Sequence, residues 1–538
     1  MRVLCAIFAG VLLLAGCSRE VHGLAGGRHP WTIPHVLRIA DIAEPDSLNP
    51  YLSQMDISYD LSSLVYSYLL VSDDRGRLVG DLATEVPTLR NGGISADGRT
   101  YTYHLRHGVR WHDGAAFTAR DVVASWRAVV APQNLTIYRD GYDRVASIDT
   151  PDPYTVVVHL RERYPPFVTQ FFAPLQEGGK PILPAHILAR GNFNRGELSR
   201  TMIGTGPFKL ASWRHGEGMT FVRNDRYFRG RPKLARIEFS VVPSAQTLLT
   251  QARTHALDMI VTPAAVLYPQ YRTLDGFTVG TAPWNQQVLV VINGGKPGLD
   301  EVAVRRALSF AIDRDGVIRT ITHGVGEPAR DAIAPTAIGY VRRPALPYDI
   351  AAANALLDRA GWRRGADGVR EKHGVRLAFT MATVAGNATY ERIPILMQQT
   401  FREIGVALAI RAYPYEQIFS TDGPIDRYTY DMAIYGSTLS WDPDSHVYYG
   451  CDEWFPKGQN FYRYCNAAYD RAEREGLATD DPTARAHIYA RADAVLWNTA
   501  AYLPLFEARR ILVHNSDLRD YRPNPTATPW WNAWQWDI

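Results

Sequence analysis

The chain has 538 residues, more than one hydrophobic core usually serves, so we expect two or three lobes. With 46% hydrophobic and 21% charged residues, the composition is that of a soluble globular protein and excludes a disordered one. A formal net charge of +3, without a cluster of lysine and arginine, excludes the electrostatic footprint of a nucleic-acid-binding protein.

The first residues read MRVLCAIFAGVLLLAGCS, in which Arg2 precedes an apolar run and small residues precede Cys17. This pattern predicts a signal peptide over residues 1–17, too short to span a bilayer stably. The tetrapeptide LAGC resembles the bacterial lipobox, which implies cleavage before Cys17 and lipid on its thiol. A plain signal peptide that contains a cysteine is the alternative. Residues 18–35 would form a tether, and we expect an exported protein that is anchored and not integral.

Several segments carry clear signals for helices and strands. Thr118 and Asp121 have the spacing of a capping box and predict a helix start. Further on, a strand over 375–383, a helix over 390–404 and a strand over 406–412 predict a crossover unit with parallel strands. Other helices are predicted over 60–70 and 244–255, from the caps Asp300 and Asp349, and over 481–497.

The stretch 430–465 begins as an apolar alternation typical of a strand and then breaks into serine, proline, glycine and acidic residues. The chain has 13 tryptophans and 29 tyrosines, and through that break the stretch keeps Tyr435, Trp441, Tyr448, Tyr449, Trp454, Phe455 and Tyr462. A long aromatic loop carried by a rigid strand is typical of a concave small-molecule site. An irregular loop packed by its own aromatic side chains is the alternative.

Two cysteines, Cys451 and Cys465, remain outside the signal region. In an oxidising compartment we predict a disulfide between them, with two free thiols as the alternative. No metal and no cofactor is expected: a zinc site would need a second close pair of ligands, and the histidines at 104, 107 and 112 have no supporting acid. The G-x-G at 204–206 precedes a proline and no helix, so it predicts a tight turn and not a phosphate site.

Several motifs, in the right order, resemble the peptide-binding class of bacterial ABC-importer solute-binding proteins, family 5, the dipeptide- and oligopeptide-binding type. The resemblance runs from about residue 36 to the end of the chain. The matching stretches are EPDSLNP at 44–50, YTYHLRHGVRWHDGAAFTARDVVASW at 101–126, GTGPFKLASW at 204–213, VRRALSFAIDRDGVI at 304–318 and ANALLDRAGW ending at Trp362.

The resemblance implies an α/β fold of the periplasmic-binding-protein type (class II, with an extra inserted domain), in which two hinged lobes surround a central cleft. By correspondence, lobe 1 would comprise 36–66, 189–284 and 505–538, the inserted domain 67–188, and lobe 2 285–504. Ligand would be engulfed between the lobes and the closed form read by a membrane permease.

In peptide-binding relatives an acid that pairs with the α-amino group of the ligand lies a few residues before a D-P step, here Asp442-Pro443. This chain has Thr438, Leu439 and Ser440 there. Either Asp442 or Asp444 has taken over, or the ligand lacks a free amine, because a buried unpaired ammonium is costly. The residues implied to line the cleft are Asn49, Trp284, Asn285, Gln286, Tyr435, Ser437, Thr438, Trp441 and Asp442. Arg427 is a candidate partner for a ligand carboxylate, or else a solvated surface residue.

We therefore predict a monomeric, non-enzymatic lipoprotein, periplasmic or at the cell surface, that captures a small peptide and delivers it to the permease of an ABC importer. Alternatives on the same fold are an oligosaccharide or a nickel chelate as the ligand. A secreted glycoside hydrolase that uses Asp442 and Asp444 is the alternative from another class, although two acids two residues apart need not face each other across a bond.

Overall fold

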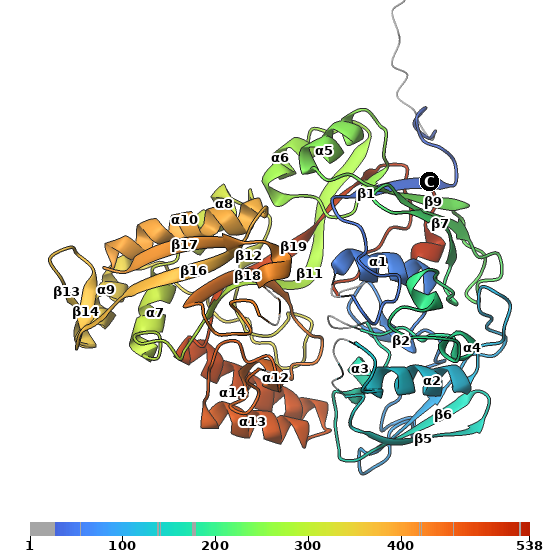
Figure 1. Ribbon diagram of the computed structural model, residues 1–538, viewed down its shortest axis with the longest axis horizontal. Coiled ribbons are helices and arrows are strands. Elements are labelled where there is room, and N and C mark those ends of the chain that lie inside the picture. Colours follow the sequence, from blue (N-terminus) through green and yellow to red (C-terminus); the bar gives the residue numbers. More distant parts are fainter. Residues whose placement is uncertain are drawn as a thin grey trace, which may run out of the picture.

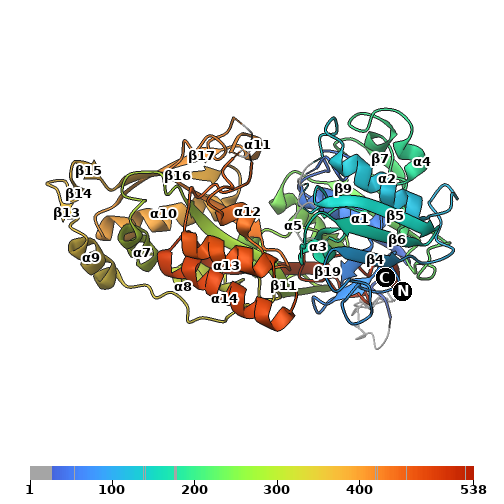
Figure 2. The same cartoon turned by 90° about the horizontal axis from the view of Figure 1, so that it is seen from below.

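The structure is a computed structural model that describes residues 27–538, except 54, 137–138, 140, 175–178, 419, 421, 456 and 527–528. Two bodies lie side by side and are joined by strands that pass between them (Figures 1 and 2). No helix within the described residues combines the length and the apolar composition needed to cross a membrane. The predicted signal peptide, with Cys17, lies outside the described residues.

One mixed sheet runs through both bodies. Its order from edge to edge is β17 (Ala407–Tyr413), β16 (Ala378–Val384), β18 (Met432–Thr438), β11 (Phe277–Ile292), β19 (Leu503–Asn515), β10 (Met259–Ile260), β1 (Val36–Asp41), β9 (Arg236–Val241), β8 (Gly218–Arg223) and β7 (Phe208–Arg214), with β12 (Glu327–Pro328) also paired to β19.

The long antiparallel strands β11 and β19 connect the two bodies. Residues 277–283 of β11 pair with 509–515 of β19 in lobe 1, and residues 287–290 pair with 503–507 in lobe 2. The register shifts between Pro283 and Gln287, where a proline has no N–H to donate to the ladder. The predicted boundaries at 285 and 505 both fall within this strand pair.

Lobe 1 and the segment 67–188 share one hydrophobic core, since buried side chains of both belong to the same cluster. The helices of lobe 1 are α1 (Asp56–Val65), α5 (Ala245–Arg253) and α6 (Tyr268–Tyr271), with short 3-10 turns at Glu197–Ser199, Ala265–Leu267 and Ala533–Gln535. Segment 67–188 contains β2 (Leu70–Ser72), β3 (Leu78–Gly80), β4 (Thr100–His104), α2 (Ala119–Val130), β5 (Val145–Asp152), β6 (Thr155–Leu160), α3 (Phe167–Gln170) and α4 (Ala185–Leu188).

Lobe 2 surrounds its half of the sheet with helices (Figure 1). They are α7 (Val302–Phe310), α8 (Arg314–Thr320), α9 (Ile350–Arg359), α10 (Ala388–Glu403), α11 (Tyr415–Ile418), α12 (His446–Tyr449), α13 (Ala467–Leu477) and α14 (Pro482–Thr499). A small separate sheet is formed by β13 (Arg363–Arg364), β14 (Arg370–Lys372) and β15 (Val375–Arg376).

Most local predictions are confirmed. The capping box at Thr118 and Asp121 is present, with the Thr118 N–H donating to Asp121 at 2.8 Å. Asp349 and Asp481 cap their helices. The strands β16 and β17, which α10 connects, pair in parallel. Asp300 is not a cap, because Glu301 occupies that position and Asp300 accepts from the Gly298 N–H.

Two segment boundaries were predicted wrongly. The helix expected over 60–70 spans Asp56–Val65, and Leu70 already begins a strand. The expected tether is too long at its C-terminal end, since residues 29–32 pack on the body. The His29 N–H donates to Asp517 at 2.6 Å, and the Trp31 ring stacks on His255 with centroids 4.3 Å apart.

The GTGP motif is structural, as its sequence suggested. A Cβ on Gly204 would lie 1.8 Å from the Val65 carbonyl oxygen, so only glycine allows this approach. His112 fixes the turn, because its ring accepts from the Gly204 N–H at 3.2 Å and donates to the Gly206 carbonyl at 3.0 Å. Burial lowers the pKa of His112 to about 4, so the ring is neutral near pH 7.

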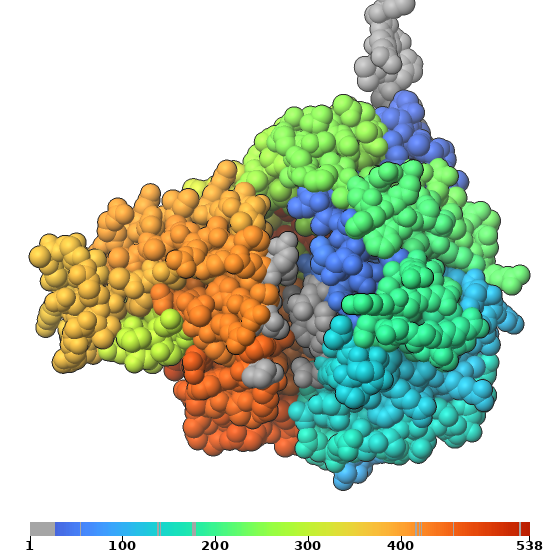
Figure 3. All heavy atoms as spheres, in the orientation of Figure 1, coloured from blue at the N-terminus to red at the C-terminus, as the bar shows by residue number. Residues whose placement is uncertain are grey.

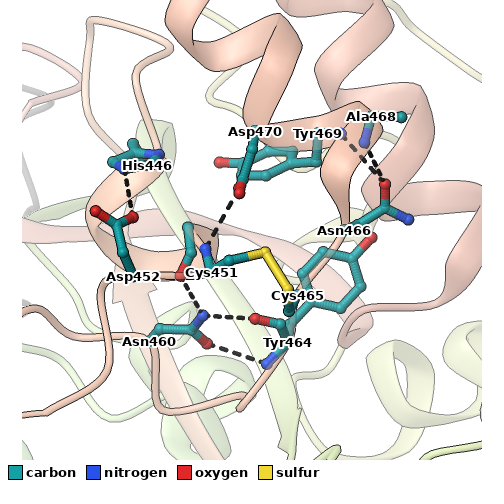
Figure 4. The surroundings of a disulfide bond; sticks show 11 residues. His446, Cys451, Asp452, Asn460, Tyr464, Cys465, Asn466, Ala468, Tyr469 and Asp470 are labelled. Carbon is teal, nitrogen blue, oxygen red and sulfur yellow. Dashed lines mark hydrogen bonds and ion pairs between the residues drawn. A yellow bond between two sulfur atoms is a disulfide. The ribbon is translucent and has the colours of Figure 1, made fainter.

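A disulfide joins Cys451 to Cys465, whose Cα atoms lie 4.5 Å apart (Figure 4). Inside the closed loop, the Asn460 amide donates to the carbonyls of Gly450 and Tyr464, each at 2.7 Å. Outside it, the Cys451 N–H donates to Asp470 on α13 at 3.3 Å. The loop is therefore anchored to the helical layer of lobe 2.

We expect the double substitution C451S/C465S to lower the free energy of unfolding by about 3 kcal/mol, because the loop of this size gains entropy in the unfolded chain. Urea unfolding of both proteins under oxidising conditions measures the difference. Reduction of the wild-type protein should lower its stability to the same extent and leave the double variant unchanged. Equal midpoints for all three states would contradict the prediction.

Candidate functional site

A cavity of about 530 Å³ lies beside the end of β18, with lining residues from lobe 2 and from segment 67–188. Figure 3 shows the boundary between the orange lobe 2 and the blue and cyan side of the molecule. This volume is within the usual range of small-ligand sites. Lobe 2 supplies most of the wall, and Arg139 and Asp143 of segment 67–188 face it from the other body. Its aromatic residues are Tyr435, Tyr448, Tyr449, Phe455, Phe461 and Tyr462.

The strand β18 sets the direction of several wall residues. Tyr435, Ser437 and Thr438 line the larger cavity, and Thr438 also lines a second, smaller one. The disulfide-closed loop adds Phe455 and Gln459 to the same wall. The predicted strand-plus-loop arrangement therefore encloses a real concavity, although Tyr449 and Tyr462 also pack against each other, with tilted rings whose centroids lie 4.6 Å apart.

Acidic residues gather at the floor of the larger cavity. Both carboxylate oxygens of Asp442 accept from the Arg485 guanidinium, at 2.6 and 2.8 Å, and both side chains are buried. Asp444 lines the cavity, with the Tyr164 hydroxyl 3.5 Å away. Burial, together with the charge of Asp442, raises the pKa of Asp444. Burial also raises the pKa of Glu473 behind it well above its usual range, and Asp444 adds to this shift.

The smaller cavity has a volume of about 150 Å³ and is lined by both lobes. Lobe 1 contributes Asp56 and Asp60 of α1, and the hinge strand contributes Trp284 and Gln286. Lobe 2 contributes Thr322 and Val325, which follow α8, and residues of α10. Arg510 of β19 completes the wall, with its guanidinium 4.6 Å from the centroid of the Trp284 ring.

One group of side chains within the described residues has the proximity of metal ligands: His446, Asp452 and Glu453, whose ligand atoms lie within 4.8 Å of one another. The Lys457 ammonium contacts both acids, at 2.6 and 2.9 Å. Because this lysine already contacts an oxygen of each acid, we assign no metal there.

The fold and its cavities agree with comparisons to known proteins. The family model of bacterial extracellular solute-binding proteins, family 5, middle region, matches residues 77–457, more than half of the chain. The chain belongs to this family. The family resemblance and the two-lobed α/β fold seen in the sequence are thereby confirmed.

Relatives with different ligands in their names cover nearly the whole chain. The oligopeptide-binding protein AppA of Bacillus subtilis is 25% identical over 92% of this chain and 91% of its own length. The nickel-binding periplasmic protein of Escherichia coli is 24% identical, over 96% of each. The solved structure of AppA in complex with a nonapeptide, at 24% identity, has a TM-score of 0.80 and covers 93% of this chain and 98% of its own.

In this family member, the residues predicted to bind ligand separate into two groups. Six of them line a cavity: Trp284, Gln286, Tyr435, Ser437, Thr438 and Asp442. Their roles toward a ligand stay predictions. The Asp442 carboxylate, however, is held on both oxygens by Arg485 and is not available to a ligand ammonium in this structure.

The other four predicted residues have structural partners and line neither cavity. Asn49 is fully buried and its amide donates to the Phe193 carbonyl at 3.1 Å. Asn285 donates to Thr336 at 2.6 Å within the hinge. Trp441 donates its indole N–H to the Gly76 carbonyl, at 2.8 Å, which bridges lobe 2 and segment 67–188. Arg427 is exposed and paired with Asp422, which is the surface-residue alternative.

Four acidic wall residues were not predicted: Asp56, Asp60, Asp143 and Asp426. The first two are four residues apart, so a helix started at residue 56 would have placed both on one face. Asp426 stands in an irregular segment before β18 and has no periodic signal. Within the described residues its carboxylate has no hydrogen bond or ion pair.

We expect Asp442→Asn to lower the free energy of unfolding by about 3–5 kcal/mol, because it leaves the buried Arg485 guanidinium unpaired. Urea unfolding followed by tryptophan fluorescence measures the loss. The double variant D442N/R485M should lose less than the two single variants together, since it removes both charges. Strictly additive losses would contradict a coupled pair.

Burial raises the pKa of Asp426 from 3.8 to about 6, opposed by Arg427. Between these values the folded protein holds a proton that the unfolded chain has lost, so stability falls as the pH rises through this window. We expect Asp426→Asn to abolish this fall and to stabilise the ligand-free protein above pH 6 by about 1 kcal/mol, a value reduced for solvent screening. Melting curves from pH 4 to 8 measure it, with the exposed E371Q as control. A parallel pH dependence in D426N and wild type would refute the assignment.

Proposed function

We propose that the protein captures a peptide between its two lobes and delivers it to the permease subunits of an ABC importer, without catalysing a reaction. The observation that carries the proposal is the larger cavity, of about 530 Å³, which is lined by aromatic side chains and hydroxyls and faced by both bodies. AppA, a relative of the same family, binds oligopeptides according to its name, and this supports a peptide as the ligand.

Capture requires that the ligand favour the closed arrangement of the lobes. Contacts between the bodies are already made around the cavity: Arg163 of segment 67–188 pairs with Asp480 of lobe 2 at 3.1 Å, and Trp441 reaches Gly76. A ligand that fills the cavity adds contacts to both bodies that the open form cannot make. Closure of the two lobes is then the signal that the permease recognises.

Arguments from this chain weigh against the alternatives. The hydrolase would need Asp442 as an acid or base, but Arg485 occupies both of its oxygens. For a nickel chelate, the only cluster of suitable ligand atoms within the described residues has both of its acids already paired with Lys457. An oligosaccharide fits the aromatic wall, and the binding experiment below separates it from a peptide.

We further propose that residues 1–17 are a signal peptide, that Cys17 carries lipid, and that the mature protein acts as a monomer at the membrane surface on the outer side. The LAGC tetrapeptide supports lipidation. Mass spectrometry of the purified protein tests it: a mature N-terminus at Cys17 with the added mass of acyl chains is expected, and an unmodified cysteine would contradict the proposal.

Di- to nonapeptides are expected to raise the melting temperature of the purified protein in a concentration-dependent manner, because they bind only the folded state. At a ligand concentration of 100 times Kd the stabilisation is about 2.7 kcal/mol. Thermal-shift screening against peptides, β-linked oligosaccharides and nickel–histidine measures it. A shift with a sugar or the nickel chelate, and with no peptide, would overturn the proposed ligand.

A further inference from the structure

The smaller cavity holds an acidic residue that the protein itself does not satisfy. Asp60 on α1 is 5% exposed and lines the cavity. Its Oδ1 atom is fully buried without a hydrogen-bond donor, and no ion pair to this side chain occurs within the described residues. Burial of a carboxyl group without a partner costs free energy, so this acid is a candidate for a functional role.

The two arginines that line this cavity have other hydrogen-bond and ring partners. Arg510 lies over the Trp284 ring and donates to the Thr526 carbonyl at 3.3 Å. Arg509 donates to the Thr281 hydroxyl at 3.0 Å. Neither arginine forms an ion pair with an acid of α1 in the described part of the chain.

Instead, carboxylates accumulate on this side of the cavity. Asp56, exposed, stands one helical turn before Asp60 on α1 and lines the same space. Asp41 of the neighbouring β1 is buried, and its Oδ2 atom has no hydrogen-bond partner within the described residues. Burial raises the pKa of Asp60 well above its usual range; Arg510 opposes this shift, and Asp56 and Asp41 add to it.

The cavity has room for a small group. Its volume, about 150 Å³, equals that of a known protein cavity that holds one benzene molecule. It can accept a chain terminus or the end of one side chain, but not a peptide. The opposite wall is formed by lobe 2, with the polar residues Gln286, Asn387, Thr389 and Thr438.

We propose that this cavity is a subsite for a cationic group of the bound peptide, an ammonium or guanidinium that pairs with Asp60 and Asp56. The inference rests on the proposed function and names the charge of the ligand. It assigns to lobe 1 the acid that is missing from positions 438–440 of lobe 2. Thr438 lines both cavities, so a peptide in the larger one can extend a group into the smaller one.

The test compares wild type with Asp60→Asn, which keeps the side-chain shape and removes the ionisable carboxyl group. The exposed Asp275→Asn on lobe 1 is the matched control. The probes are tri- to pentaalanine with a free α-amino group, the same peptides N-acetylated, and N-acetylated versions with one lysine. Affinities come from thermal shift and titration calorimetry at pH 7.5.

We expect at least one cationic probe set to bind D60N roughly tenfold or more weakly than wild type and D275N, because a hydrogen bond to a charged group is lost. Loss confined to free-amine alanine peptides identifies the α-amino group, and loss confined to the acetylated lysine peptides identifies a side chain. Acetylated alanine peptides should bind wild type and D60N alike. Equal affinity of all probes for wild type and D60N would overturn the subsite.

A ligand-free measurement separates this inference from the proposed function. Because Asp60 gains a proton on folding, the melting temperature of wild type relative to D60N should fall as the pH rises from 4 to 8, with no such trend for D275N. If no peptide binds but this trend is present, the proposed ligand fails and the unsatisfied acid stands. A constant difference between wild type and D60N would mean that the protein already satisfies Asp60, and the inference fails.

Discussion

The antiparallel pairing of β11 with β19 is the constraint on which the rest of the structure depends. These two strands belong to both lobes, so a single hydrogen-bonded ladder carries the connection between two cores. The ladder is interrupted after Pro283. Of the residues that follow, Trp284 and Gln286 line the smaller cavity, and Asn285 donates a hydrogen bond to Thr336. The residues of this irregularity therefore also form part of the wall of the smaller cavity.

The acidic side chains that line the cavities are of two kinds: one is paired within the protein, and the others lack such a partner within the described residues. Asp442 is fully satisfied by Arg485 inside lobe 2, and this pair fixes the loop after β18 against α14. Asp60 and Asp426 line cavities without such partners in the described part of the chain. A carboxylate that the fold satisfies contributes to rigidity, whereas one left unpaired in a cavity lowers the stability of the empty protein and is available to a ligand.

The sequence predicted the fold better than the site, for physical reasons. Helix caps and crossover units are local patterns, so Thr118, Asp349 and Asp481 were assigned correctly. Family motifs such as GTGP mark backbone packing, and the structure explains them by the approach of the Val65 carbonyl. The partner of Asp442, in contrast, lies 43 residues away. Nothing in the local sequence distinguishes this acid from Asp60, whose side chain has no partner within the described residues, because burial and pairing depend on the tertiary fold.

Recognition of a ligand cation by an acid of lobe 1 couples the binding of that cation to closure of the two lobes. A cation recognised only by lobe 2 would bind with similar strength in the open and the closed form, and such binding shifts no equilibrium. The cavity at Asp60 exists only where α1 of lobe 1 meets the polar residues of α10 and β18 of lobe 2. A cation there gains its acidic partners from one lobe and its enclosure from the other, so its binding energy differs between the two forms. Placed at this junction, the recognition of charge itself favours the closed protein.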